Sequence, residues 1–315
     1  MRKRTVKVYA PASISNLGSG FDIIGIAIDK PGDYVTASRT AEPGLAFSID
    51  KPNDDLPGDT KDNVALHVAT LMVDELKPKF GIKMVLHKQM PVGSGLGSSA
   101  ASSVASVFAV NSLLSKPLRR CDLLRFAIEG ERKATGATHA DNVAPSLFGG
   151  ACIVRRYDPI DIIPLKIKNT IYWSVIHPKI TIRTKDARSV LPESIPLRTA
   201  VAHWGNVAGM SVALMTGDAR LAGTCTEDLI AEPARAHLIP GFAEVKKAAL
   251  NAGAFGCTLS GSGPSVFAVA GSLRNARTAA RAMNDAFQYH AGVECDTYIS
   301  KINKHGVHIV SRRDT

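Results

Sequence analysis

The sequence predicts an α+β fold made of two domains, 1–160 and 161–315. Short β-branched or alternating runs are mixed with helical stripes, without the regular strand–helix alternation of a βαβ wind. The 315 residues, 45% of them hydrophobic, are enough for two cores. Between the halves, the prolines at 159 and 164 in DPIDIIPLKI interrupt regular structure. We therefore expect the domain boundary at this connector.

The first domain begins with short runs bounded by Gly, Pro and Asp, which are typical of strands. Apolar residues at 64, 65, 68, 71 and 72 fall on one stripe and predict a helix. A Gly/Ser-rich loop precedes two further helices, and another loop leads to the last strand. In order, we expect strands at 6–10, 23–28, 34–38 and 45–49, a helix at 63–76, a strand at 82–87, helices at 98–114 and 119–132, and a strand at 151–156.

The second domain has the order of elements expected of a small α/β sandwich. No internal repeat or low-complexity tract interrupts this pattern. We expect strands at 171–177, 257–260 and 265–270 and near 297 and 307, and helices at 198–215, 242–251 and 274–287.

Composition argues against several classes of protein. A net charge of +10 suits an anionic ligand, but the basic residues are scattered and aromatic residues make up only 6%, so we expect no nucleic-acid partner. The five cysteines lie more than thirty residues apart and form no CxxC pair, which argues against zinc sites and disulfides.

Nothing in the sequence predicts a membrane protein. The longest apolar stretch, 100–114, contains serines and falls short of the roughly 20 residues that span a bilayer. Too few apolar residues separate the basic N-terminus from Pro11 for a signal peptide. We expect a cytoplasmic protein with no membrane partner.

The most informative segment is the glycine-rich loop PVGSGLGSSAA at 91–101. Its three glycines let the backbone approach a ligand closely, and Ser98 and Ser99 open a helix whose free N–H groups favour anions. This is the chemistry of a phosphate site. A flexible, serine-capped helix start is the alternative interpretation.

Two common phosphate motifs do not fit this loop. A Walker A loop needs Lys after its last glycine, where this chain has Ser98. Gly95, Gly97 and Ala100 match G-x-G-x-x-A formally, but five residues separate the strand from the glycines. A second helix, instead of a strand ending in an acid, follows the first, which disfavours a Rossmann site.

The loop PxxxGLGSSAA resembles the nucleotide-binding signature of the GHMP small-molecule kinases. PASISNLGSGFDIIG at 11–25 and LSGSGPSVFA at 259–268 are similar to two further motifs of that family, in the same order, so the resemblance covers nearly the whole chain. It implies the GHMP kinase fold, with a ribosomal S5 domain 2-like N-terminal domain that binds ATP and a ferredoxin-like α/β sandwich as the C-terminal domain.

Within that family, the stretches 139–150, 184–192 and 232–242 are most similar to the homoserine kinases. Ser15 departs from the usual Ala, and Ser19 from a common Pro. The resemblance implies ATP-dependent phosphorylation of L-homoserine to O-phospho-L-homoserine, in threonine biosynthesis, by a homodimer. The alternatives are another GHMP kinase with a different alcohol substrate, or a catalytically silent nucleotide-binding member.

The resemblance implies that ATP binds at the glycine-rich loop, near an asparagine and at a second glycine loop. These residues are Asn63, Pro91, Val92, Gly93, Ser94, Gly95, Leu96, Gly97, Ser98, Ser99, Ala100, Ala101, Gly261, Ser262 and Gly263. Mg²⁺ would lie between a loop serine, preferably Ser99, and Glu131. Without the resemblance, Glu131 is a solvated helix-end residue, Asn63 a helix cap and the second glycine loop a hairpin turn.

The resemblance also implies a site for a small zwitterion. Arg188 and Arg235 match two arginines that would clamp the carboxylate. Asn16, Asp22 and His139 would orient the ammonium group and the polar tail. Taken singly, Asn16 and Asp22 are turn residues and His139 is a loop histidine. The two arginines, taken singly, are exposed side chains.

The acceptor hydroxyl must also lose a proton. In the mevalonate branch of the family an Asp lies eleven positions after the metal-binding Glu, and here that position is Asn142, which cannot accept a proton. We expect Asn142 to orient the hydroxyl while the proton passes to a phosphate oxygen or water. Asp141 is the candidate base if one exists.

Overall fold

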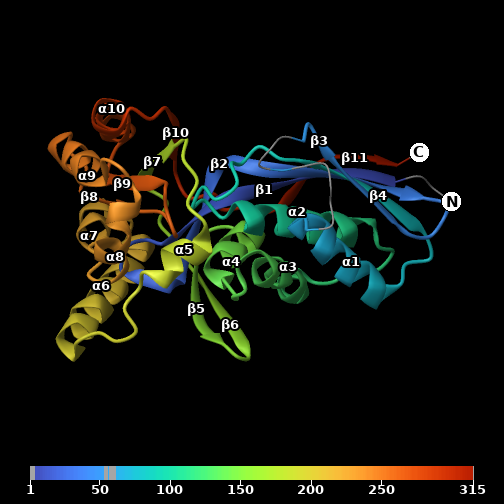
Figure 1. Ribbon diagram of the computed structural model, residues 1–315. Helices are drawn as coiled ribbons and strands as arrows, with labels where there is room; N and C mark the ends of the chain where they lie inside the picture. The colour runs from blue at the N-terminus through green and yellow to red at the C-terminus, as the bar shows by residue number, and fades with distance from the viewer. Residues whose placement is uncertain (1–3, 53–55, 57–61, 315) are drawn as a thin grey trace.

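The structure, a computed structural model, describes residues 4–52, 56 and 62–314. Two sheets lie at opposite ends of the molecule, each packed against helices (Figure 1). All strand pairings between the described elements are antiparallel except that of β3 (Leu45–Asp50) with β4 (Gly81–His87). The predicted α+β class is therefore confirmed.

The first sheet has seven strands in the described part of the chain. Its main path runs β11-β1-β2-β4-β3, and β5 pairs with β2 and β6. The remaining strands of this sheet are β1 (Arg4–Asn16), β2 (Gly20–Thr40), β5 (Ala151–Tyr157), β6 (Ile160–Leu165) and β11 (His308–Asp314).

The two runs predicted as separate strands at 23–28 and 34–38 are one long strand, β2. Its first part pairs with β5 and its last part with β4, while β1 follows it along most of its length. The turn before β2 therefore lies far from β4, beside the second domain (Figure 1). Asn16, at the end of β1, and Asp22, near the start of β2, lie on either side of this turn.

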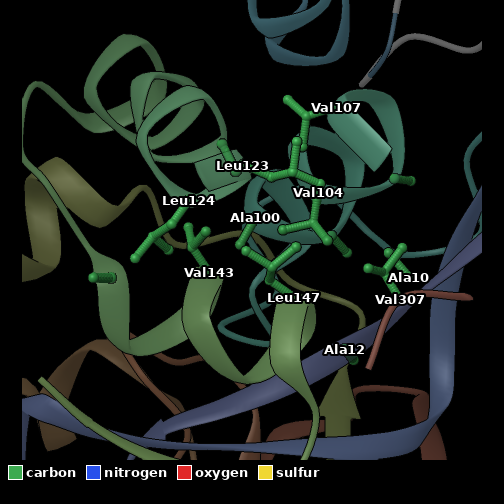
Figure 2. Packing of buried hydrophobic residues seen from close by; sticks show 14 of the residues in the cluster. Ala10, Ala12, Ala100, Val104, Val107, Leu123, Leu124, Val143, Leu147 and Val307 are labelled. Carbon is green, nitrogen blue, oxygen red and sulfur yellow. The ribbon is translucent and has the colours of Figure 1, made fainter. Parts of the chain in front are cut away.

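Four helices cover one face of the first sheet (Figure 1). They are α1 (Val64–Leu76), α2 (Ser98–Leu113), α3 (Arg120–Thr135) and α4 (Ala140–Phe148). Figure 2 shows side chains of three of these helices meeting beside β1, among them Val104, Leu123 and Leu147. Helix α2 is rich in Ala and Ser and is buried on nearly every side. Small side chains let its neighbours approach, and a Cβ at Gly130 of α3 would lie 2.0 Å from Ser103 Oγ.

Two further expectations for the first domain are wrong. The segment before 151, which was expected to be a loop, contains α4. Its internal Pro145 hides this helix in the sequence, because proline normally argues against a helix. The connector at 158–167 contains β6, in which Pro164 is tolerated because β6 pairs only with β5 among the described strands. Strands β6 and β11 both join the first sheet from beyond residue 160, and a division at 160 stays a prediction.

The second sheet has the order β10-β7-β9-β8, with α9 and α10 on one side and α6 and α7 on the other (Figure 1). The predicted strands and long helices of this domain are confirmed, while the short helices α5, α7 and α8 were not expected. The bounds are β7 (Tyr172–Pro178), α5 (Thr184–Ser189), α6 (Leu197–Thr216), α7 (Ala219–Thr224), α8 (Ala231–Arg235), α9 (Phe242–Asn251), β8 (Gly256–Leu259), β9 (Val266–Ala270), α10 (Leu273–Ala291) and β10 (Cys295–Ser300).

Among the described helices, none combines the length and the apolar character that crossing a bilayer requires.

Candidate active site

A cavity of about 540 Å³ opens where the two halves of the chain meet. The first half lines it with the glycine-rich loop, the turn between β1 and β2 and the starts of α2 and α4. The second half adds α5, the end of α8 and the turn between β8 and β9. Clefts of this size between domains are common ligand sites.

The glycine-rich loop is pressed against both halves of the chain. Gly95 and Gly97 have positive φ values of 74° and 66°. A Cβ at Gly95 would lie 2.5 Å from the Ser260 carbonyl oxygen, and one at Gly97 would lie 2.2 Å from Ser13 Oγ. Only glycine fits at these positions. Gly97 precedes α2 and no side chain caps that helix, so its first N–H groups are available to an anion, contrary to the serine-cap alternative.

A buried ion pair holds the strand end that leads into this loop. Asp33 is fully buried and accepts hydrogen bonds from Lys88 Nζ at 2.5 Å and Ser102 Oγ at 2.7 Å. Its other oxygen accepts from the backbone N–H groups of Gln89 and Met90. Because the carboxylate is paired and fully hydrogen-bonded, it anchors both the loop entry and the first turn of α2.

Two serine hydroxyls of the second domain donate hydrogen bonds to the same loop. Ser260 Oγ donates to the Gly95 carbonyl at 2.7 Å, and Ser265 Oγ donates to the Ser94 carbonyl at 2.6 Å. His177 Nδ1 lies 3.1 Å from Ser265 Oγ, and burial lowers the pKa of this histidine. The turn between β8 and β9 is the hairpin of the alternative interpretation, and it also lines the cavity.

A hydroxyl and a carboxylate meet beside the start of α2. Ser99 Oγ donates to Glu131 Oε1 at 2.5 Å, and only 4% of Glu131 is exposed, so the solvated-glutamate interpretation is wrong. No cluster of three or more Asp, Glu, His or Cys suited to a metal occurs among the described residues. A hydroxyl with one carboxylate nevertheless fits Mg²⁺ next to phosphates, because magnesium keeps water ligands and takes few protein oxygens.

His139 lies between Glu131 and Arg188 and so connects the two ends of the cavity. Its Nδ1 lies 3.6 Å from Glu131 Oε2, and Arg188 Nη2 donates to its Nε2 at 2.8 Å. Burial acts to lower the pKa of His139, but the neighbouring carboxylates outweigh it and raise that pKa. The arginine donor opposes a proton on Nε2, so we assign a neutral ring with its proton on Nδ1.

Two guanidinium groups lie at the far end of the cavity. Arg188 Nη2 donates to both oxygens of Asp22, at 2.9 and 2.8 Å. Arg235 is 3% exposed and donates to the carbonyl oxygens of Ala187 and Gly261. Both cations lie over the ring of Phe21, which spaces them within one pocket. The exposed-arginine interpretation is therefore wrong for Arg235.

The turn between β1 and β2 is flanked by polar residues with a strained backbone. Asn16 and Asp22 have φ values of 68° and 60°, in the left-handed region. Asn16 Oδ1 accepts from the Asp22 backbone N–H at 3.1 Å, and its Nδ2 donates to the Gly261 carbonyl at 3.2 Å. The turn itself is residues 17–19, so the turn-residue interpretation is wrong: Asn16 ends β1, Asp22 lies near the start of β2, and both line the cavity.

Two residues in the first turn of α4, Asn142 and Asp141, line the cavity but differ in their hydrogen bonding. The Asn142 amide donates to Ser15 Oγ at 3.0 Å and accepts from Ser13 Oγ at 2.8 Å, so its orientation is defined. Ser15, which stands where the family usually has Ala, therefore helps to orient the Asn142 amide. Asp141 is 2% exposed, and its Oδ1 has no hydrogen-bond partner within the described part of the chain. Burial, followed by the charge of Asp22, raises the pKa of Asp141 to about 7.

The other predicted ligands fall into two groups. Asn63, Val92, Gly93, Ser94, Ser98 and Ser262 line the cavity. Asn63 also caps α1 by accepting from the Ala65 N–H at 2.9 Å. Pro91 and Gly263 do not line the cavity, and the side chains of Leu96, Ala100 and Ala101 are buried in the core, so a ligand contact there would use the backbone.

Several cavity residues were missed in the sequence. Phe21 lies inside the first motif, and Lys88 is a charge directly after a strand end, which was the available signal. Thr135 and Thr181 also line the cavity, and nothing in their local sequence marks them. Lys185 lines it too, and it lies in the stretch 184–192 that resembles the homoserine kinases.

Two family models match the chain. The N-terminal domain of GHMP kinases matches residues 63–150, and the C-terminal model of GHMP kinases matches residues 210–288. The fold is similar to that of the L. major mevalonate kinase, with a TM-score of 0.72 at 18% identity over 94% of this chain and 96% of that one. Fold and site together are those of a two-domain small-molecule kinase.

Relatives that match nearly the whole chain show which kind of small-molecule kinase it is. The homoserine kinase of Chlorobaculum tepidum is 42% identical over 98% of this chain and 99% of that protein, and that of Pyrococcus abyssi is 36% identical over 96% and 98%. The crystal structure of homoserine kinase from Cytophaga hutchinsonii superposes with a TM-score of 0.92 at 45% identity, over 97% of both chains. The chain belongs to the GHMP kinase family, among its homoserine kinases.

The buried Asp141 carboxyl predicts a pH-dependent stability. A carboxyl with a raised pKa stabilises the fold fully below its unfolded pKa near 4, and this contribution is lost as the pH rises through about 7. Without ligands, Asp141→Asn should therefore become more stable than the wild type between pH 4 and 7, by a few kcal/mol and about 4 at most. Denaturant unfolding of both proteins at several pH values measures this difference. A difference that is constant with pH would contradict the assignment.

Proposed function

We propose that this protein transfers the γ-phosphoryl group of ATP to the side-chain hydroxyl of L-homoserine, giving O-phospho-L-homoserine. One observation carries the proposal: a cavity that begins at a glycine-rich loop ends in paired guanidinium and carboxylate groups. Phosphate needs the first end and an amino-acid zwitterion needs the second. His139 lies between them, in contact with Arg188 and 3.6 Å from Glu131.

At the nucleotide end, the triphosphate binds the backbone N–H groups of the glycine-rich loop and of the first turn of α2. Asn63 lies near the adenine, and the turn at Gly261 covers the phosphates from the second domain. Ser99 and Glu131 would hold Mg²⁺, which would supply charge neutralisation to the transferring phosphoryl group.

At the acceptor end, Arg188 and Arg235 bind the α-carboxylate of homoserine. Asp22 and Asp141 face its ammonium group, and Asn16 and His139 orient the polar tail. The positive ammonium next to Asp141 lowers the cost of ionising that buried carboxyl, so substrate binding and loss of the Asp141 proton support each other. A sugar or mevalonate has no α-ammonium group to provide this charge.

The proton of the acceptor hydroxyl leaves without a side-chain base in this proposal. Asn142 is held by Ser13 and Ser15 and orients the hydroxyl towards the γ-phosphorus. Phosphoryl transfer through a loose transition state needs little proton removal before bond formation, so a phosphate oxygen or water can accept the proton late.

We further propose a cytoplasmic homodimer with the domain division near residue 160. The substrate is tested by ADP release with homoserine, mevalonate, shikimate, galactose and serine as acceptors. Homoserine should give the highest kcat/KM. Equal or greater turnover of another alcohol would reject the proposed substrate, and no ADP release with any of them would reject kinase activity.

Replacing the carboxylate at the nucleotide end should slow the reaction. Glu131→Gln keeps the shape but removes the charge, and we expect kcat to fall by about 10² or more, because a metal ligand acts where the charge of the transferring group develops. Steady-state kinetics at saturating Mg²⁺ and ATP measures this. Glu129→Gln, on the exposed face of the same helix, is the control. Near-normal kcat in Glu131→Gln would remove Glu131 from the site.

The two arginines should act on the acceptor alone. Arg188→Leu and Arg235→Leu should each lower kcat/KM for homoserine by roughly 2 to 4 kcal/mol, because the substrate carboxylate loses a buried charge partner, while the KM for ATP stays nearly unchanged. Initial rates with each substrate varied in turn separate these effects. Arg277→Leu, exposed on α10, is the control. An equal loss for ATP would assign the arginines to the nucleotide or to the fold.

If no side chain acts as the base, replacing two neighbouring residues should have different effects on the kinetics. Asp141→Asn should raise the KM for homoserine but keep substantial kcat, whereas Asn142→Leu should lose kcat because the hydroxyl is no longer oriented. A general base contributes about 10² to 10⁴ in rate, so single-turnover rates distinguish the models. If kcat of Asp141→Asn falls by that factor with both KM values intact, Asp141 is the base.

A further inference from the structure

Tyr157, the last residue of β5, reaches the acceptor end of the molecule without lining the cavity. Its ring packs against the larger hydrophobic core. Its hydroxyl donates a hydrogen bond to the backbone carbonyl of Asp22 at 2.6 Å, and Asp22 does line the cavity. Any effect of Tyr157 on a bound substrate must therefore pass through another residue.

The backbone of Asp22 needs contacts of this kind. Its φ of 60° lies in the left-handed region, where a residue other than glycine is held by its surroundings. The Asp22 N–H donates to Asn16 Oδ1 at 3.1 Å, and the Asp22 carbonyl accepts from Tyr157. Side chains from β1 and from β5 thus fix the polar groups on both sides of the carboxylate that meets Arg188.

The Tyr157 hydroxyl lies among the charges of the acceptor end. Burial raises its pKa well above the ordinary value, and the charges of Asp141 and Asp22 raise it further, while the charge of Arg188 acts in the opposite direction. A raised pKa keeps the proton on the phenol oxygen across the neutral range. The hydroxyl therefore remains a donor to the Asp22 carbonyl and does not act as a base.

The first sheet determines why this tyrosine reaches Asp22. Strand β5 runs antiparallel to the beginning of β2, with Ile153 opposite Ile24. Continuing along β5 in the same direction leads towards the start of β2, where Asp22 lies. The chain then turns sharply, because Tyr157 pairs with Ile160 of β6. Strand pairing on both sides of β5 places the tyrosine more firmly than a loop would.

We propose that Tyr157 is a positioning residue for the acceptor. Its hydroxyl holds the left-handed backbone of Asp22, and thereby sets the Asp22 carboxylate between Arg188 and the ammonium group of the substrate. This rests on the proposed function, in which Asp22 faces that ammonium group. Tyr157 lies outside every motif and stretch that carries the family resemblance, so only the contact with Asp22 points to it.

A tyrosine that serves the fold alone is the competing interpretation, and Tyr9 provides the matched comparison. The Tyr9 hydroxyl also donates to backbone carbonyls of β2, those of Asp29 at 2.5 Å and Pro31 at 3.2 Å. Neither of these two residues lines the cavity. Removing either hydroxyl takes a hydrogen bond from β2, but only the loss of the Tyr157 hydroxyl affects the acceptor end.

Replacing each tyrosine by phenylalanine separates the two interpretations. Tyr157→Phe should raise the KM for homoserine by roughly tenfold, because a displaced Asp22 carboxylate no longer meets the ammonium group, while kcat and the KM for ATP change by less than about twofold. Tyr9→Phe should leave all three unchanged. Steady-state kinetics measures these values, and denaturant unfolding shows that both variants are folded. An unchanged KM for homoserine, or an equal loss for ATP, would overturn the proposal.

A double-mutant cycle tests whether Tyr157 acts through Asp22. Asp22→Asn removes the charge that meets the ammonium group, so adding Tyr157→Phe to it should raise the KM for homoserine by less than about twofold more. The full tenfold increase in that background would show that Tyr157 acts without the Asp22 carboxylate, and the proposal would be wrong.

Crystal structures without substrate test the contact independently of turnover. If the wild type phosphorylates no homoserine, the proposed function fails, but the role of Tyr157 in holding Asp22 is still measured. The wild type and Tyr9→Phe should keep the Asp22 φ near 60° and its carboxylate on Arg188. Tyr157→Phe should lose this arrangement. An Asp22 that is unchanged in Tyr157→Phe would overturn the proposal.

Discussion

The close approach of the glycine-rich loop to both halves of the chain is the constraint on which the rest of the site depends. There is no space for a Cβ at Gly95 or Gly97, and the hydroxyls of Ser260 and Ser265 hold the loop carbonyls from the second domain. With the carbonyls held, the N–H groups of the loop and of α2 remain for phosphate. The proposed phosphate site therefore depends on the docking of the two domains as well as on a motif within one of them.

The charges at the acceptor end are arranged so that an amino acid completes them. Within the cavity Asp22 is neutralised by Arg188, while one oxygen of Asp141 has no partner among the described residues and the pKa of this carboxyl is raised to about 7. A buried polar group without a partner destabilises a fold, and such groups gather at functional sites. In the proposed complex, the zwitterion would bring one charge for the arginines and one for the aspartates and would relieve this cost.

The sequence predicts the elements of this fold better than it predicts their partners. Periodicity located the long helices and most strands, but α4 was hidden by Pro145 and β6 by Pro164, since proline normally argues against both. Motif resemblance singled out Glu131 and Arg235, and both line the cavity. It did not find Lys88, whose partner Asp33 lies 55 positions away, and no local pattern reveals that the Asp141 carboxyl is buried beside Asp22. Such properties arise from contacts between distant segments, which a single sequence does not display.

Helix α6 is connected to Arg235 at the edge of the cavity through a short series of contacts. His203, on the buried face of α6, lies 3.2 Å from the carboxylate of Asp228, which accepts hydrogen bonds from the first backbone N–H groups of α8. Helix α8 ends at Arg235, whose guanidinium enters the cavity. The placement of Arg235 therefore depends on the packing of α6 against α8 through His203 and Asp228, as well as on the contacts of Arg235 itself.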